Sequence, residues 1–217
     1  LYDDPELIDI YRLFANLRMN LLPYIYAEAN YCAQVARPLM AHLAIAFPND
    51  SKAWVVHDQF MFGRDLLVAP ILEEQAQGRS IYLPEGCWHD LFTGATYAGS
   101  QVISYRCPLD RIPVFVRDGA VLPVHLNDKG IMGTRSREGG VSNKLDEYCQ
   151  LAFLRFGGDT FHFTDDLGNE LWLATGRVRG RGPVDAVLVI DALSSGDAMH
   201  LFGRGLAGDL VAVEEMP

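Results

Sequence analysis

The side chains of this sequence best suited to acid–base chemistry stand in adjacent pairs. Asp3-Asp4, His57-Asp58 and Asp165-Asp166 each place two titratable groups side by side, and paired groups of this kind can act as general acid and general base. Two of the pairs also have a structural interpretation. Asp3-Asp4 precedes Pro5 and an apolar run with helical period, so it predicts a helix cap. Asp165-Asp166 favours a turn, with a weak calcium or sugar contact as the alternative.

Other titratable residues are better explained by structure than by catalysis. Beside His57, we expect Asp58 to pair with the local backbone or with Arg37. His42 lies in an almost continuously apolar run, which indicates a hydrogen-bonded core histidine. Asp110 and Arg111 are expected to position a loop of a β domain. The structural candidates are therefore Arg37, Asp58, Asp110 and Arg111.

The three tryptophans, Trp54, Trp88 and Trp172, could stack on sugar rings. Trp88 follows Gly86 in a predicted hairpin, and we expect it to pack between domains. Trp172 is the best candidate for a peripheral sugar platform, and it is the substrate-binding residue that the sequence suggests.

The four cysteines, at positions 32, 87, 107 and 149, contain no C-x-x-C pair. This spacing predicts ordinary reduced thiols and no structural zinc site. If Cys87 and Cys107 lie on neighbouring strands, they form the disulfide to check. No metal or cofactor is expected.

The chain changes character near residue 65. Residues 4–33 predict one long helix that Pro23 should kink or split. Residues 38–47 predict a strand buried on both faces, as in a parallel sheet or barrel. One helix–strand unit cannot form a barrel alone, so we expect further elements upstream. Short strands follow, with Gly and Pro between them, at 66–71, 80–83, 87–92, 102–105, 112–116 and 120–123. A polar loop at 127–147 then precedes strands at 148–156, 160–164, 170–173, 184–193 and 198–202.

Bulk composition excludes two classes of partner. The chain has 217 residues and a formal net charge of -10, and such an acidic protein repels the phosphates of nucleic acids. No window approaches the roughly 18 apolar residues that a membrane helix needs. Compartment and oligomeric state are left open, with the cytoplasm slightly favoured.

Several motifs in fixed order resemble glycoside hydrolase family 31. They are Arg37-Pro38-Leu39, Phe47-Pro48-Asn49-Asp50, Asp58 to Gly63, Asp65 to Pro70, Tyr82 to Asp90 and Pro108 to Arg117. The resemblance covers about residues 5–123. Where family members usually have a small residue and often a tyrosine, this chain has Cys87 and His89. Phe163 to Gly168 is similar to a turn of the family's distal domain.

The resemblance implies a mainly β fold with an N-terminal α/β segment. Residues 1–65 would be the last elements of a (β/α)8 barrel, 66–126 a proximal antiparallel β-sandwich, and 127–217 a linker plus a distal one. It also implies a retaining, exo-acting α-glycosidase of the α-glucosidase or α-xylosidase type, acting on α-linked oligosaccharides by double displacement. The family's catalytic carboxylates belong to barrel segments expected upstream of Leu1, so no catalytic residue is assigned here. The alternative is a β module that binds carbohydrate without cutting it, or a purely structural one.

Overall fold

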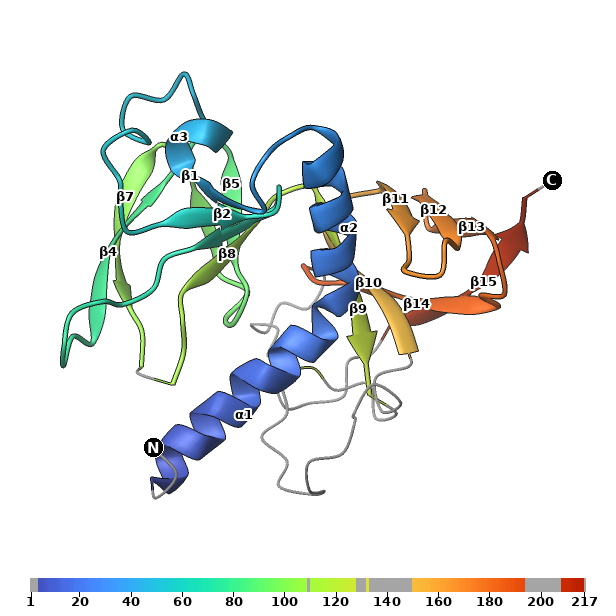
Figure 1. The fold of residues 1–217 in the computed structure, drawn as a ribbon, viewed down its shortest axis with the longest axis horizontal. Helices are drawn as coiled ribbons and strands as arrows, with labels where there is room; N and C mark the ends of the chain where they lie inside the picture. The colour runs from blue at the N-terminus through green and yellow to red at the C-terminus, as the bar shows by residue number, and fades with distance from the viewer. Residues whose placement is uncertain (1–3, 109, 128–131, 133–149, 194–207, 217) are drawn as a thin grey trace. The chain divides into compact units, whose positions relative to one another are not determined.

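The structure is a computed structural model that describes residues 4–108, 110–127, 132, 150–193 and 208–216. The chain divides into two compact units (Figure 1). The unit Glu28–Ala120 is continuous in sequence, whereas the other combines Leu1–Ala27 with Val121–Pro217. Each unit has its own hydrophobic core.

The predicted N-terminal helix is two helices, α1 (Pro5–Asn20) and α2 (Leu22–Gln34), drawn in blue in Figure 1. The carboxylate of Asp4 caps α1 by accepting the N–H groups of Glu6 at 3.0 Å and Leu7 at 3.3 Å. The break falls at Leu21, because Pro23 has no N–H to continue the helical ladder and fits the first turn of a new helix. The predicted split is therefore confirmed.

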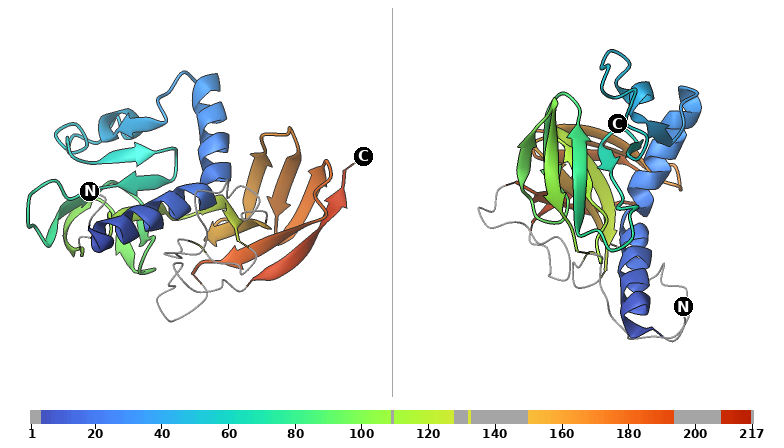
Figure 2. Two further views of the ribbon diagram at one scale, coloured as in Figure 1. Left: turned by 60° about the horizontal axis from the view of Figure 1, so that its bottom comes forward. Right: turned by 90° about the vertical axis from the view of Figure 1, so that its left-hand side faces the viewer.

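The Glu28–Ala120 unit is built on a six-stranded sheet in the order β1-β2-β3-β8-β5-β6. Its strands run in colour from light blue to green in Figure 2. Its strands are β1 (Met40–His42), β2 (Phe60–Phe62), β3 (Leu66–Val68), β8 (Val114–Arg117), β5 (Cys87–Asp90) and β6 (Thr96–Ala98). All five pairings are antiparallel. A separate two-stranded antiparallel sheet, β4 (Gly78–Leu83) and β7 (Gln101–Arg106), packs with this sheet around a common core. That core includes Met61, Leu67, Ile81, Leu83, Trp88 and Phe115.

The predicted buried strand at 38–47 is wrong in length and in pairing. Only Met40–His42 is a strand, at the edge of the sheet and antiparallel to β2. The chain then turns into a short helix, α3 (Leu43–Ala46), because His42 Nδ1 accepts the N–H of Ala44 at 3.1 Å and caps it. The structure shows no barrel in the described residues, and β1 and β2 lie in the same sheet as the strands after residue 65.

The other unit carries a seven-stranded sheet in the order β11-β12-β13-β15-β14-β10-β9. Its strands are β9 (Ala120–Leu126), β10 (Gln150–Phe156), β11 (Thr160–Thr164), β12 (Glu170–Ala174), β13 (Arg177–Arg181), β14 (Ala186–Asp191) and β15 (Asp209–Glu215). The purely antiparallel arrangement expected here is wrong, because β10 pairs with β14, and β13 with β15, in parallel. The strand β9, which the sequence grouped with residues 66–126, belongs to this sheet.

The core of this second sheet is aromatic. Phe153 packs edge-on against Phe161 and Phe163, with ring centroids 5.7 and 6.0 Å apart. In β13 the burial alternates, so that Val178 and Gly180 face the core while the arginines between them are exposed. The predicted strand at 198–202 lies outside the described residues, as does most of the predicted loop at 127–147. No described helix has the length and apolar character needed to cross a membrane.

Candidate functional site

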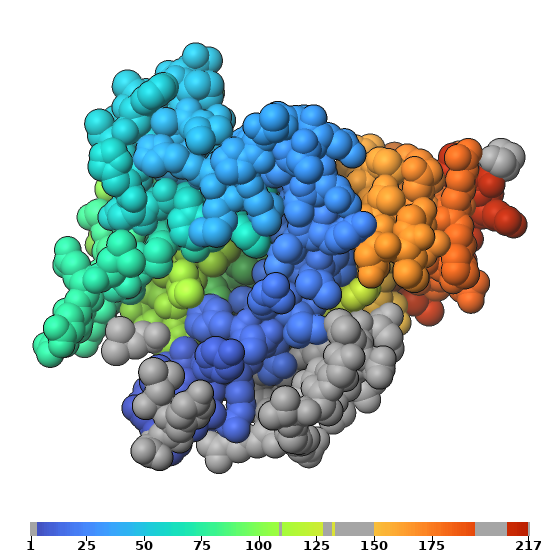
Figure 3. Space-filling model, viewed as in Figure 1, coloured from blue at the N-terminus to red at the C-terminus, as the bar shows by residue number. Residues whose placement is uncertain are grey.

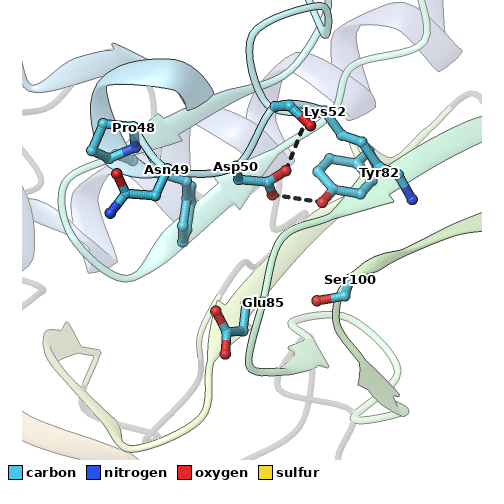
Figure 4. A pocket seen from close by; sticks show the side chains of 10 residues that line it. Pro48, Asn49, Asp50, Lys52, Tyr82, Glu85 and Ser100 are labelled. Carbon is cyan, nitrogen blue, oxygen red and sulfur yellow. Dashed lines mark hydrogen bonds between the residues drawn. The ribbon is translucent and has the colours of Figure 1, made fainter.

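A pocket of about 540 Å³, lined by both polar and apolar side chains, opens on the Glu28–Ala120 unit (Figure 4). The loop after α3 forms one side, and Glu85 and Ser100, from the turns after β4 and before β7, form the other. Its lining residues are Ala46, Phe47, Pro48, Asn49, Asp50, Ser51, Lys52, Tyr82, Glu85 and Ser100.

Asp50 is the central acceptor of this pocket. One carboxylate oxygen accepts the Tyr82 hydroxyl at 2.5 Å and the other accepts the Lys52 N–H at 3.0 Å (Figure 4). Burial, together with the bond to Asp50, raises the pKa of Tyr82 to about 12. The side-chain amide of Gln59 donates to the Tyr82 carbonyl at 2.7 Å and accepts the Tyr82 N–H at 2.8 Å, which fixes the backbone of Tyr82. Because both of its carboxylate oxygens are hydrogen-bonded, Asp50 is placed to hold the loop after α3. The pocket also offers hydroxyl, amide and carboxylate groups to a polar ligand.

A buried ionic cluster surrounds Glu28, the only charged residue of α2. The Glu28 side chain is 2% exposed and accepts the Arg64 guanidinium at 2.7 Å and the Arg64 backbone N–H at 2.9 Å. Burial, and next the charge of Glu28, raise the pKa of the neighbouring Asp65 to about 6. A perturbed carboxyl can mark an active site or a structural ion pair, and the direct Glu28–Arg64 contacts favour the structural role. The sequence analysis missed this cluster, although a lone acid in an apolar helix was its signal.

The four residues that the sequence analysis assigned a structural role have the following contacts. The Asp58 carboxylate pairs with Arg79 at 2.5 Å, so the expected pairing with Arg37 or the local backbone is wrong. Arg37 is half-buried, and its N–H donates to the Cys32 carbonyl at 2.9 Å. The Arg111 guanidinium lies 5.8 Å from the centre of the Phe92 ring, beside half-buried Asp110.

Trp88 lies in the core of the Glu28–Ala120 unit, where it has no exposed surface and donates to the Pro84 carbonyl at 2.9 Å. In the other unit, Asp165 accepts the N–H groups of Leu167 at 2.9 Å and Asn169 at 2.8 Å, which confirms the predicted turn at Asp165.

Trp172 stands on the outer face of the seven-stranded sheet. Its neighbours across the strands are His162 on β11 and Arg179 on β13. The His162 ring stacks on the indole with centroids 4.7 Å apart and an angle of 13°, while Arg179 pairs with Glu214 at 3.2 Å. In Figure 3 these strands (orange) form a continuous surface. Because His162 covers one face of the indole, a sugar would have to contact its edge or its other face.

The cysteines in the described residues are free thiols. Cys87 and Cys107 form no disulfide, and Cys149 lies outside the described residues. Burial raises the pKa of Cys107 to about 11, with the charge of Asp90 as the next cause. Within the described part of the chain, Cys87, His89 and Asp118 form one group of side chains that could hold a metal ion.

Comparison with known proteins places this arrangement in a family. Residues 36–122 match the family model described as the glycosyl hydrolase family 31 C-terminal domain. The chain is 34% identical over 201 residues to an isomaltosyltransferase of Sporosarcina globispora, covering 92% of this chain and 18% of the relative. It is 35% identical over 112 residues to an alpha-xylosidase of Saccharolobus solfataricus, covering 51% of this chain and 15% of the relative.

Among solved structures, the cycloalternan-forming enzyme of Listeria monocytogenes, in complex with a pentasaccharide substrate, aligns with a TM-score of 0.71 and 29% identity. The alignment covers 86% of this chain and 18% of that one. The chain thus spans less than a fifth of the length of these relatives. This chain belongs to glycoside hydrolase family 31, and residues 36–122 are the C-terminal domain of that family. The mainly β character that the resemblance implied is confirmed.

Proposed function

We propose that the chain is the C-terminal part of an exo-acting, retaining α-glycosidase of the α-glucosidase or α-xylosidase type. The observation that carries this proposal is the similarity to an isomaltosyltransferase along 92% of the chain, together with the family domain at 36–122. The substrate would be an α-linked oligosaccharide or glycoside.

In a double displacement, one carboxylate attacks the anomeric carbon while a second protonates the leaving oxygen. The second then activates a water, which releases the sugar with retained configuration. We place both carboxylates in barrel elements outside this chain, and we assign to its β domains the role of bracing that barrel. The fixed hydrogen bonds of Asp50 support a structural role for the main carboxylate of the pocket.

The test is an assay of the purified 217-residue chain with aryl α-glucosides and α-xylosides. We expect no turnover above the blank, because the chain lacks the carboxylates. The same assay on the longer protein that this proposal requires should show hydrolysis, with the α-anomer released first in the NMR spectrum. Turnover by the short chain, in a preparation free of host glycosidase, would refute the placement of the carboxylates.

The second candidate is a carbohydrate-binding role for the outer face around Trp172, which the exposed neighbour His162 and the half-buried indole support. Titration calorimetry with α-linked glucooligosaccharides should then give millimolar or tighter binding that Trp172→Ala abolishes. Trp54→Ala is the matched control, since Trp54 is 58% exposed in the other unit. A flat titration of the unmodified chain counts against this role.

A further inference from the structure

Three metal-ligating side chains of different chemistry meet beside β5. The thiol of Cys87, the imidazole of His89 and the carboxylate of Asp118 have ligand atoms that all lie within 4.8 Å of one another. Cys87 and His89 are two residues apart on one strand, so they share a face of the sheet. Asp118 follows β8, and its N–H donates to the Cys87 carbonyl at 2.9 Å, which fixes the turn next to the strand. The backbone therefore holds the three groups together.

His89 is oriented as a ligating histidine would be. Its Nδ1 lies 3.0 Å from the Thr96 hydroxyl, on the residue directly opposite in β6. Its Nε2 points at Asp118 Oδ1, 2.8 Å away, and the residue is only 3% exposed. In metal sites, the second ring nitrogen of a histidine usually bonds an oxygen, which fixes the tautomer and the ring plane. Thr96 is placed to do this for His89.

One tautomer of His89 favours a cation in this group. When Nδ1–H donates to Thr96, the lone pair of Nε2 faces the Asp118 carboxylate, and two acceptors then confront each other. A cation between them turns this contact into two ligand bonds. The metal-free alternatives carry a proton on Nε2 that donates to Asp118: the neutral tautomer, in which Thr96 donates to Nδ1, and the imidazolium, in which both ring nitrogens donate. Only the tautomer with a free Nε2 lone pair can bind a metal.

Cys87 differs from the two buried thiols of the same unit. The Cys32 thiol donates to the Pro38 carbonyl and the Cys107 thiol to the Arg111 carbonyl. In the described part of the chain the Cys87 thiol makes no hydrogen bond, and the residue is half-buried. The side chain of Asp118 is 52% exposed, so solvent reaches the group from that side.

We propose that Cys87, His89 and Asp118 bind a divalent transition-metal cation of the zinc class, with water as the fourth ligand. Thiolate, imidazole and carboxylate are the ligands zinc prefers, at about 2.0–2.3 Å in tetrahedral geometry. These bonds place ligand atoms about 3.3–3.6 Å apart, so binding needs a rotation of the Cys87 side chain and a small opening of the His89–Asp118 contact. The site is separate from the proposed glycosidase chemistry and does not depend on it.

Cobalt(II) and zinc(II) titrations of the purified, reduced chain test the site. Cobalt should bind with one equivalent and show a thiolate charge-transfer band in the near ultraviolet, which zinc should abolish. Cys87→Ser should remove the band, whereas the control Cys32→Ser should keep it. Asp118→Asn should weaken zinc binding at least tenfold, measured by competition with a chromogenic chelator, while Glu85→Gln, at another exposed acid, should not.

The melting temperature is a second measurement, and it distinguishes a lost metal site from a variant that does not fold. Zinc should raise the melting temperature of the unmodified chain and of Cys32→Ser, and leave that of a folded Cys87→Ser unchanged. Absence of the cobalt band in the folded, reduced chain would overturn the proposal. A band that survives Cys87→Ser would overturn it as well, because the ligand would then be another thiol.

Discussion

The buried carboxylate of Glu28 should contribute measurably to the stability of the fold. Its carboxylate accepts both the side chain and the backbone of Arg64. In Glu28→Gln the amide keeps part of these bonds, but the guanidinium loses the carboxylate that pairs with it directly. We expect the free energy of unfolding to fall by about 2 kcal/mol, measured by urea denaturation.

The control is the pair formed by Asp9 and Arg12 on α1, whose side chains are 27% and 39% exposed, against 2% for Glu28. Arg12→Gln should change the free energy of unfolding by less than about 0.5 kcal/mol. Equal losses in the two variants would show that burial does not set the strength of the Glu28 pair.

Asp65 should make stability depend on pH. Its folded-state pKa is raised from 3.8 to about 6, so the folded chain binds this proton more tightly than the unfolded chain does. The protonated Asp65 carboxyl therefore stabilises the folded state. This contribution to the free energy of unfolding is fully present below about pH 4 and is lost as pH rises through about 6. Asp65→Asn stays neutral, and its stability relative to the unmodified chain should rise across that range. Urea midpoints at several pH values check this, and a constant difference would contradict it.

Local patterns predicted single residues better than distant pairings did. The cap at Asp4 and the turn at Asp165 were predictable because their partners lie within four residues. Asp58 was assigned the wrong partner because Arg79 is 21 residues away and meets it only through the fold. The pairing of Glu28 with Arg64 spans 36 residues and was missed for the same reason.

At the scale of elements, the link between β6 and β7 depends on Gly99. A Cβ at this position would overlap the Pro84 carbonyl oxygen, and the Gly99 N–H donates to the Gly86 carbonyl at 2.7 Å. Gly99→Ala must therefore separate two backbone segments, and we expect a loss of about 1–3 kcal/mol. Thermal unfolding followed by circular dichroism measures it.

Ala98→Ser is the matched control, since Ala98 is exposed and adjacent in sequence. It should change stability by less than about 0.5 kcal/mol. A Gly99→Ala chain as stable as this control would show that the two segments can move apart freely.

The short strands between Gly and Pro residues were largely predictable, since turn residues delimit them. The apolar run at 38–47 was not, because an edge strand followed by one helical turn has the same composition as a longer buried strand. The strand β13 was missed as well, since its core-facing positions are a valine and a glycine between arginines. Parallel pairing in the second sheet depends on connections that strand patterns do not encode.

At the scale of the whole molecule, the division into two units predicts that one of them folds without the other. Residues 28–120 contain a complete sheet and a closed core, so we expect this segment, expressed alone, to fold and to unfold cooperatively. Far-ultraviolet circular dichroism and a thermal melt provide the measurement. A non-cooperative melt or a disordered spectrum would show that the segment needs the flanking residues.

The discontinuity of the other unit has a consequence for the order of synthesis. Asn20 donates to the His125 carbonyl at 2.7 Å across 105 residues of chain. A ribosome adding about 5–20 residues per second needs about 5 to 20 s to cover that distance. During that time α1 has no partner strand, because β9 is made only after residues 28–120. The leucines that α1 buries, Leu13 and Leu17, are then a natural target for chaperones in the nascent chain.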